Sequence, residues 1–430
     1  MKYILSNVYV FVHDKFIKSN VIIDNNIISD ISTKEFFPSS DNIIFNLDNC
    51  FLFPGFLDVH VHLREPGFFC KETIKSGTMA AARGGYTTVC SMPNLSPTPD
   101  SRENLDIQLE LIRKNACIEV IPYGTITIGE NGEELTNYEG LANDVCGFSD
   151  DGRGVQNNKI MKEAMTKISQ LGKVLAAHCE DESLIRGGYI HAGDYAAENK
   201  HRGICSESEW KQIERDLELV RETGCKYHIC HVSTKESVDL IRQAKLEGLD
   251  VSCETAPHYL VMNDDMLKDE GRFKMNPPIR SELDRLSLII GIKDGTIDMI
   301  ATDHAPHTSE EKSKGLKDSA MGIVGLETAF PILYTELVKK ELVSLEKLIN
   351  LLHENPRKRF KIGNPLGVGQ VANFTVFDLE KNYKINPEDF LSMGKATPFE
   401  NKEVYGECIL TMASGKIAYQ GKNLKPEKEV

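Results

Sequence analysis

The chain has 430 residues, of which 41% are hydrophobic and 27% charged, as expected for a globular protein with a large core. Its formal net charge of -14 argues against nucleic acid or an anionic membrane as the partner. No apolar run approaches the ~20 residues of a membrane span, and no signal peptide is expected. Eleven cysteines without CxxC spacing favour reduced thiols and a cytoplasmic protein.

The first part of the chain, residues 1–51, predicts short β-strands, among them a hairpin about Asp24-Asn25-Asn26. From Leu52 onward the pattern changes to short apolar β-runs, most of them followed by a helical stretch. These runs cover 56–60, 86–92, 117–123, 144–149, 173–178, 226–231, 249–255 and 297–302. Short apolar runs suit parallel strands that are buried on both faces.

Eight such strands alternating with helices predict a closed (β/α)8 TIM-type barrel over residues 52–360. A doubly wound open sheet is the alternative, and the lack of a glycine-rich phosphate loop after the first strand weakens it. Residues 361–430 return to alternating β-runs such as GQVANFTVFD. We therefore expect an α/β protein in which both chain ends, 1–51 and 361–430, build one small β-sandwich beside the barrel.

The first barrel strand, in FLDVHVHLREPG, carries His60 and His62. Residues two apart on a strand point to the same face, so both imidazoles can reach one ion. Imidazole suits zinc and similar divalent metals. For this pair alone, packing in a core is the better explanation, so other strand ends must decide.

In such barrels the chemistry lies at the carboxyl ends of the strands. The fourth predicted strand runs into Asp150 and Asp151, the fifth ends in His178, the sixth in His231 and the eighth in Asp303. Together with the first strand, this set is large enough for two metal ions bridged by a carboxylate and a hydroxide. One of two adjacent aspartates must point away, and we expect Asp150 to hydrogen-bond the turn.

Two motifs of the chain, DVHVHLREPG and ATDHAPHTSEEK, resemble the signature motifs of the dihydroorotase family in the amidohydrolase superfamily. The blocks MPN (92–94), FSDDG (148–152), MNPPIR (275–280) and GIVGLET (322–328) resemble intervening blocks of that family, in its longer, bacterial-type branch. The resemblance implies reversible interconversion of N-carbamoyl-L-aspartate and L-dihydroorotate, a step of de novo pyrimidine synthesis.

The resemblance also implies roles for single residues. Zinc would be bound by His60, His62, His178 and His231, with two ions per subunit bridged by Asp151 and a hydroxide. By the same resemblance, the hydroxide would be the nucleophile, and Asp303 would be the general acid/base and a metal contact. Substrate-binding positions are His62, Arg64, Asn94, Asn276, His307 and the backbone of Met321 and Gly322.

Two departures from the family pattern stand out. Many relatives bridge their metals with a carboxylated lysine near the end of the fourth strand, where this chain has no lysine, which makes Asp151 the candidate bridge. Met321 stands where phenylalanine is expected. Of the other histidines, His304 is expected in a supporting or structural role, and His258 is a weaker candidate for the site.

Two rival functions remain at this point. A hydantoinase or allantoinase on the same scaffold predicts the lysine bridge, and no arginine in the HxH loop. A catalytically inactive homologue that serves as a scaffold for aspartate transcarbamoylase predicts lost ligand histidines, and this chain keeps every one. The resemblance leaves open a homodimer or an association with aspartate transcarbamoylase.

Overall fold

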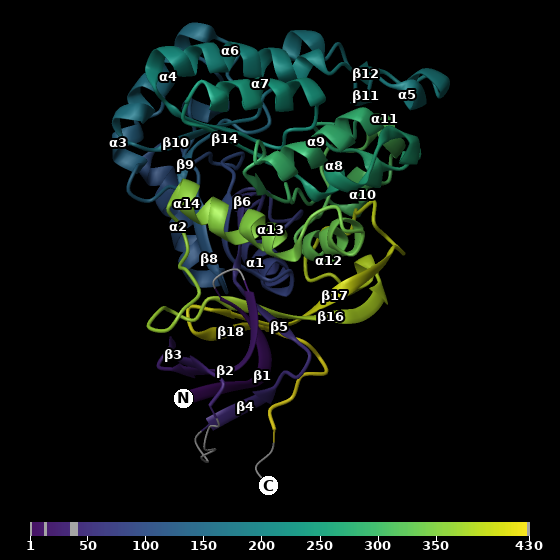
Figure 1. Ribbon diagram of the computed structural model, residues 1–430. Helices are drawn as coiled ribbons and strands as arrows, with labels where there is room; N and C mark the ends of the chain where they lie inside the picture. The colour runs from purple at the N-terminus through teal and green to yellow at the C-terminus, as the bar shows by residue number, and fades with distance from the viewer. Residues whose placement is uncertain (1, 13–14, 35–41, 428–430) are drawn as a thin grey trace.

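Eight parallel strands form a ring, and with their helices they make up the larger part of the molecule, above the terminal strands in Figure 1. The structure, a computed structural model, describes residues 2–12, 15–34 and 42–427. The ring strands are β6 (Phe56–Val61), β7 (Tyr86–Ser91), β8 (Glu119–Pro122), β9 (Gly147–Phe148), β10 (Val174–Ala177), β13 (Lys226–Ile229), β14 (Val251–Thr255) and β15 (Met299–Ile300). They match the eight β-runs read from the sequence.

Two sheets make up this ring. One has the order β6-β7-β8 and the other β15-β14-β13-β10-β9. Single parallel bridges join them, between Gly124 and Phe148 at one seam and between Val61 and His304 at the other. Strands β6, β7 and β14 are buried at every position, because helices cover the outside and side chains fill the inside. The predicted (β/α)8 barrel is thus confirmed.

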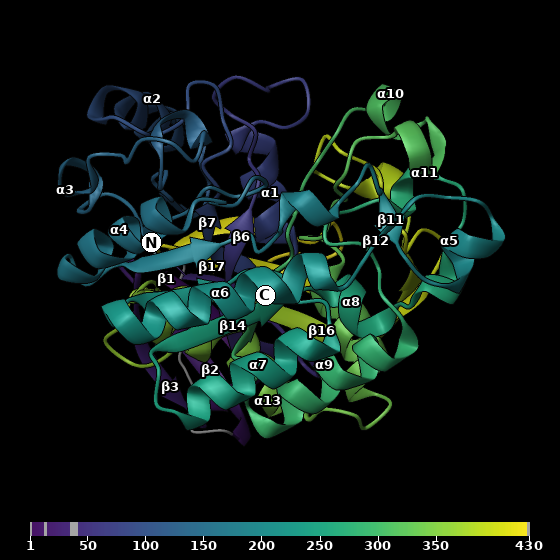
Figure 2. The same ribbon diagram turned by 90° about the horizontal axis from the view of Figure 1, so that it is seen from above.

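Helices surround the barrel, and Figure 2 shows α4, α6, α7 and α9 outside the strands. The main helices are α1 (Ile74–Arg83), α2 (Arg102–Asn115), α4 (Asn158–Gln170), α6 (Glu207–Thr223), α7 (Lys235–Leu246) and α9 (Glu282–Asp294). Side chains of Thr73 and Ser281 cap the first turns of α1 and α9, and Gly224 and Gly295 end α6 and α9 in the left-handed conformation. None of the described helices combines the length and apolar character that crossing a bilayer requires.

Shorter elements fill the connections. They include the helices α3 (Tyr138–Leu141), α5 (Asp194–Glu198), α8 (Pro257–Val261), α10 (Ser309–Lys312), α11 (Gly315–Asp318), α12 (Ala329–Leu333), α13 (Leu345–Ile349) and α14 (Asn355–Phe360). The remaining pieces are a two-stranded sheet, β11 (Ile190–His191) with β12 (Gly203–Ile204), and single turns of 3-10 or π-helix.

Both chain ends meet in a separate eight-stranded sheet. Its strands are β1 (Lys2–Val12), β2 (Lys15–Asp24), β3 (Ile27–Ser32), β4 (Asn42–Asn46), β5 (Phe51–Pro54), β16 (Phe374–Lys384), β17 (Glu403–Ala413) and β18 (Lys416–Gln420), in the order β18-β17-β16-β5-β1-β2-β3 with β4 on β1. The predicted hairpin turn has positive φ at Asn25 and Asn26, 49° and 72°, as a tight turn between antiparallel strands requires.

This terminal sheet folds over its own hydrophobic core. Leu5 and Val21 from the amino-terminal strands share one buried cluster with Phe374 and Leu410 from the carboxyl-terminal strands, and the two halves form the predicted β-sandwich. The division of the chain at residues 51/52 and 360/361 stays a prediction, and the strand β5 crosses the first of these positions.

An aromatic cluster connects the sandwich to the barrel. Phe330 of α12 lies 4.2 Å from Phe377 of β16, 5.3 Å from Phe56 of β6 and 5.6 Å from Phe53 of β5, measured between ring centroids. All four side chains are buried. Because both chain ends and the first barrel strand contribute to it, this cluster places β6 relative to the sandwich.

Asp58 closes the barrel between its first and last strands. The carboxylate, fully buried on β6, accepts hydrogen bonds from Thr302 N at 3.1 Å, from Thr302 Oγ1 at 2.6 Å and from His60 N at 3.0 Å. Thr302 follows β15, so one side chain ties together the two strand ends that carry His60 and Asp303.

We expect Asp58→Ala to lower the free energy of unfolding by about 3 kcal/mol, because it leaves buried donors without an acceptor. Urea denaturation of the purified protein measures the change. The control is Asp265→Ala at an exposed position, for which less than about 0.5 kcal/mol is expected. Equal losses in the two variants would contradict this role of Asp58.

Candidate active site

The six predicted metal ligands come together at the carboxyl end of the barrel. His60 lies on β6 and His62 just beyond it, while Asp151, His178, His231 and Asp303 follow β9, β10, β13 and β15. All six side chains are buried, with exposed fractions between 0% and 7%. Residues up to 243 positions apart in sequence are therefore neighbours within one small, buried volume.

Asp151 lies at the centre of the six. Its Oδ1 atom is 3.4 Å from His60 Nε2, 3.7 Å from His231 Nε2 and 3.8 Å from His178 Nδ1. Its Oδ2 atom is 3.5 Å from His62 Nε2. One carboxylate thus faces four imidazoles, three through Oδ1 and one through Oδ2.

Two groups of donors lie on either side of Asp151. Asp303 Oδ1 is 3.1 Å from His62 Nε2 and 3.5 Å from His60 Nε2. On the other side, His178 Nδ1 is 2.9 Å from His231 Nε2. The arrangement has the form of two adjoining donor sets that share one carboxylate.

The donor atoms fit a divalent metal ion. His60 Nε2 and Asp151 Oδ1 are buried and have no hydrogen-bond partner among the described residues. An unpaired buried polar atom costs ~1–3 kcal/mol, and a cation between the two atoms removes that cost. Nitrogen and carboxylate donors in this combination suit zinc and similar metals.

Electrostatics keep both carboxylates ionised. Burial by itself raises the pKa of Asp151, but the imidazoles of His60, His231 and His62 outweigh it and hold that pKa well below the ordinary value. The pKa of Asp303 is lowered in the same way, since His60 and His62 overcome its burial. Two negative charges therefore persist here at neutral pH, as a cation site requires.

Three site residues have strained backbones. Arg64, His231 and Asp303 have positive φ angles of 62°, 35° and 49°. For residues with a side chain, this conformation costs ~1–3 kcal/mol and persists only where the surroundings impose it. Each of the three is at or just beyond the end of a barrel strand, where the turn directs its side chain toward the centre of the site.

Two groups behind the donors select which ring nitrogen faces inward. His60 Nδ1 donates to Glu254 Oε1 at 2.7 Å, and His62 Nδ1 donates to Asn94 Oδ1 at 2.9 Å. Because each Nδ1 bonds these groups, each Nε2 is the ring nitrogen that faces the centre of the site and is left to bind a metal ion. Asn94 was expected to bind substrate, and it also orients a metal ligand.

Glu254 belongs to a wider buried network. Its Oε2 atom accepts from His228 Nε2 at 3.0 Å, and His228 Nδ1 is 2.8 Å from Ser252 Oγ. Burial raises the pKa of Glu254, yet the neighbouring His60 and His228 bring it down to about 2. Glu254 was not among the predicted site residues. A glutamate within the apolar β-run 249–255 was the signal that could have identified it.

Arg64 and Lys71 flank the ring of His307, and the three residues form a wall beside the donors in which the two flanking groups are cations, here called the cationic wall. Arg64 is only 9% exposed, donates from Nε to Pro306 O at 3.2 Å and places Nη2 3.4 Å from His307 Nε2. His307 Nε2 donates to Met321 O at 2.7 Å, and its Nδ1 accepts from Lys71 Nζ at 3.3 Å. Burial and the charges of Arg64 and Lys71 lower the pKa of His307 to about 3, so the ring is neutral between two cations.

The remaining predicted substrate residues lie at the same rim. Asn276 Nδ2 donates to Glu180 Oε1 at 2.9 Å and is 3.4 Å from His178 Nε2. Gly322 N donates to Lys274 O at 3.1 Å. The structure thus brings together every residue that the sequence analysis placed at the site. It adds Lys71 and Glu180, which no sequence pattern indicated.

Three further residues near the site have structural contacts. The His304 carbonyl accepts from His62 N at 2.8 Å, and its ring lies between Gly325 N and Glu72. Asp150 turns away from the donors and accepts from Ile126 N at 2.7 Å. His258 is buried, which lowers its pKa to about 4, and its Nε2 has no partner among the described residues.

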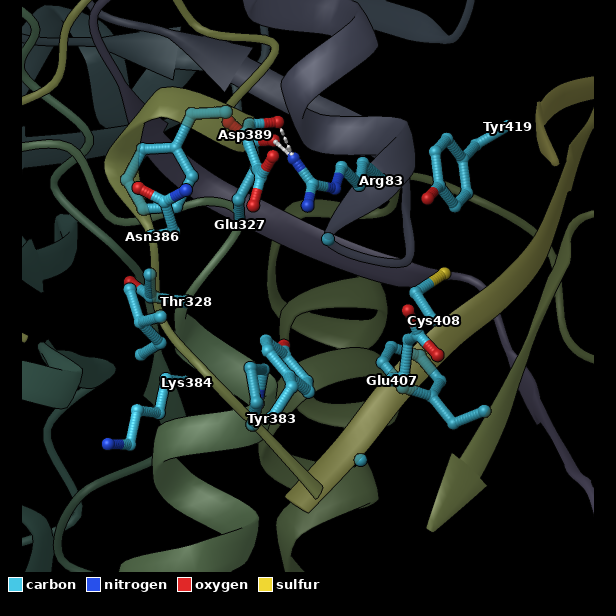
Figure 3. A pocket seen from close by; sticks show the side chains of 16 residues that line it. Arg83, Glu327, Thr328, Tyr383, Lys384, Asn386, Asp389, Glu407, Cys408 and Tyr419 are labelled. Atoms are coloured by element: carbon cyan, nitrogen blue, oxygen red, sulfur yellow. Dashed lines mark hydrogen bonds and ion pairs between the residues drawn. The ribbon is translucent and has the colours of Figure 1, made fainter. Parts of the chain in front are cut away.

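A second cavity, of about 200 Å³, lies between the barrel and the sandwich (Figure 3). Arg83 at the end of α1 pairs there with Glu327 at 2.9 Å, facing Tyr383 and Glu407 of the terminal sheet. Arg83 and Gly84 precede β7, so the cavity opens at the amino ends of the strands and away from the donors. It contains none of the predicted site residues.

Known proteins share both the sequence and the fold of this chain. The family model described as Dihydro-orotase-like matches residues 50–237. A relative named dihydroorotase from Fusobacterium nucleatum is 50% identical over 418 residues, covering 97% of this chain and 98% of the relative. One of the same name from Bacillus licheniformis is 44% identical over 426 residues, covering 98% and 99%.

Solved structures agree in fold. A structure titled L-hydantoinase (dihydropyrimidinase) from Arthrobacter aurescens has a TM-score of 0.88 and 27% identity, covering 99% of this chain and 97% of that one. A dihydropyrimidinase from Brevibacillus agri has a TM-score of 0.85 at 21% identity, covering 99% and 96%. The second likeness concerns the fold alone.

We expect Glu254→Gln to weaken metal binding about 10- to 100-fold, because the amide no longer holds the Nδ1 proton of His60 as a carboxylate does. Dialysis against graded chelator, followed by metal analysis, measures the change. Glu119→Gln, at an exposed position of β8, is the control and should match the unaltered protein. Unchanged metal retention in Glu254→Gln would remove Glu254 from the orienting role.

Proposed function

The chain belongs to the dihydroorotase family, and we propose that it catalyses the reversible cyclisation of N-carbamoyl-L-aspartate to L-dihydroorotate in de novo pyrimidine synthesis. One observation carries the proposal. A buried set of metal donors and the cationic wall adjoin at one end of the barrel. One short loop contributes His62 to the donors and Arg64 to the wall. A ring with an anionic substituent needs both features, one for the chemistry and one for recognition.

We assign two zinc ions to the donor atoms. His60, His62 and Asp303 would hold one ion, His178 and His231 the other, with Asp151 between them. The two groups on either side of Asp151 support this assignment, as do the unpaired atoms His60 Nε2 and Asp151 Oδ1. When bound, such ions lower the pKa of a water molecule and polarise the carbonyl that is attacked.

Asp303 is the proposed proton carrier. Its carboxylate is buried and ionised, and Oδ1 lies 3.1 Å from His62 Nε2, beside the donors. In hydrolysis it takes a proton from the attacking water and delivers it to the ring nitrogen as the carbon–nitrogen bond breaks. In cyclisation the same carboxylate takes the proton from that nitrogen and returns it to the departing oxygen.

The cationic wall recognises the substrate carboxylate. Arg64 offers a planar fork of N–H donors that fits a carboxylate in two places. Its Nε already donates to Pro306 O, which holds the guanidinium in position. Asn94, Asn276 and the backbone of Met321 and Gly322 complete the proposed contacts with the ring.

Hydrolysis of a hydantoin-type ring is the second candidate, because a structure titled L-hydantoinase shares the whole fold at 27% identity. Arg64 distinguishes the two activities, since a hydantoin without a carboxylate has no use for a buried cation.

We also place the protein in the cytoplasm, because its eleven cysteines are all free thiols, the state that a reducing compartment maintains.

The purified protein provides the direct test. We expect bound zinc, together with turnover of both L-dihydroorotate and N-carbamoyl-L-aspartate, and much slower hydrolysis of a 5-substituted hydantoin. Ring closure takes up a proton, so the equilibrium should shift toward dihydroorotate as the pH falls. Faster hydantoin hydrolysis favours the second candidate, and metal without any turnover supports an inactive homologue.

We expect Arg64→Met to lower kcat/KM for dihydroorotate by at least about 100-fold with zinc content unchanged. The loss of two charge-assisted hydrogen bonds, each ~1.5–3 kcal/mol, accounts for two or more orders of magnitude. Dihydrouracil, the same ring without the carboxylate, should be affected far less. Arg83→Met, at the second cavity, is the control with near-normal kinetics. Equal losses for both rings would make Arg64 a structural residue.

A further inference from the structure

Lys312 at the end of α10 has an unusual environment. The residue is only 8% exposed, and among the described residues its ammonium group bonds backbone carbonyls and no carboxylate. Instead Nζ donates to Ala320 O at 2.7 Å, Gly322 O at 2.7 Å and Lys274 O at 3.0 Å. An ammonium group has three N–H donors, so three backbone carbonyls use all of them.

The three carbonyls belong to segments that carry the proposed substrate contacts. Ala320 and Gly322 flank Met321, whose own carbonyl accepts from His307 Nε2 at 2.7 Å. Lys274 lies two residues before Asn276, and its carbonyl also accepts from Gly322 N at 3.1 Å. Lys312 itself ends the short helix that begins just after His307. One ammonium group therefore joins the three pieces of chain that carry these proposed substrate contacts.

Stability alone does not explain a charge at this position. An ammonium group without a carboxylate partner is costly to bury, and burial together with the nearby Lys274 lowers the pKa of Lys312 to about 7. An apolar side chain of similar length would fill the same space without that cost. What the apolar side chain lacks is a set of directed bonds to three separate segments.

We propose that Lys312 is a positioning residue for substrate binding, which holds the 320–322 and 274–276 segments so that Met321 O and Asn276 face the substrate beside His307. The proposal depends on the proposed function. It predicts that the loss of the ammonium group weakens binding of the substrate more than it slows the chemical step.

The test begins with kcat and KM of the unaltered protein for L-dihydroorotate, and a lack of turnover there counts against the proposed function and not against Lys312. With turnover established, Lys312→Met should raise KM about tenfold or more, change kcat less than threefold and leave metal content unchanged. Lys312→Arg, which keeps the charge and N–H donors, should recover most of the loss in KM. Should Lys312→Met not fold, Lys312→Gln takes its place with the same expectations.

The matched control is Lys173→Met. Lys173 Nζ also donates to a backbone carbonyl, Val145 O at 2.8 Å, but it lies before β10, at the opposite end of the barrel from the donors. Its KM should stay normal. An unchanged KM in Lys312→Met, or a parallel fall of kcat and metal content, would overturn the proposal.

A double-mutant cycle tests whether Lys312 and His307 are coupled in substrate binding. If Lys312 positions Met321 beside His307, then the combined variant His307→Asn, Lys312→Met should raise KM by less than the product of the two single increases. Fully additive increases in KM would show that the two residues act independently, which contradicts the proposed route.

Discussion

A single buried carboxylate, Asp151, faces four imidazoles, and the rest of the site depends on this electrostatic interaction. Burial penalises its charge, so the charge is tolerable only where positive or polarised groups surround it. The imidazoles come from β6 and from the ends of β10 and β13. A closed ring of parallel strands is an efficient way to bring them there, because it sends the carboxyl ends of all strands to one rim.

The groups behind the donors give the site its precision. Glu254 and Asn94 bond Nδ1 of His60 and His62, so that both Nε2 atoms face inward. The left-handed backbones of His231 and Asp303 aim two further side chains. Asp58 ties the first strand to the last. Each of these contacts restricts the conformation of a metal-binding side chain. Together they hold the donor atoms in position before a metal ion or substrate binds.

Charge is distributed unevenly over the molecule. The chain carries a formal net charge of -14, which repels an anionic substrate at long range. Next to the donors, however, Arg64 and Lys71 flank a neutral His307, and Lys312 sits behind the same wall. Local cations at bonding distance outweigh a screened global charge, because the low dielectric of the buried rim strengthens short contacts.

Sequence patterns were sufficient for the barrel and for most of the donors. The eight β-runs were visible as short apolar segments, and the HxH pair follows from the two-residue repeat of a strand. The placement of His178, His231 and Asp303 follows from the rule that barrel chemistry lies at strand ends. The specific substrate contacts came from the resemblance to a family and not from the patterns themselves.

Only the tertiary structure decided the contacts between distant segments. Glu254 meets His60 across 194 positions, and Lys312 meets carbonyls that no side-chain pattern marks. The choice of Asp151 over Asp150 came from the resemblance to a family, and the structure adds that Asp150 accepts from Ile126 N. Local periodicity reports which face of its own strand or helix a residue occupies. Periodicity does not determine the register between neighbouring strands or the backbone angles at strand ends. Nor does it determine which distant residue a side chain meets once the barrel closes.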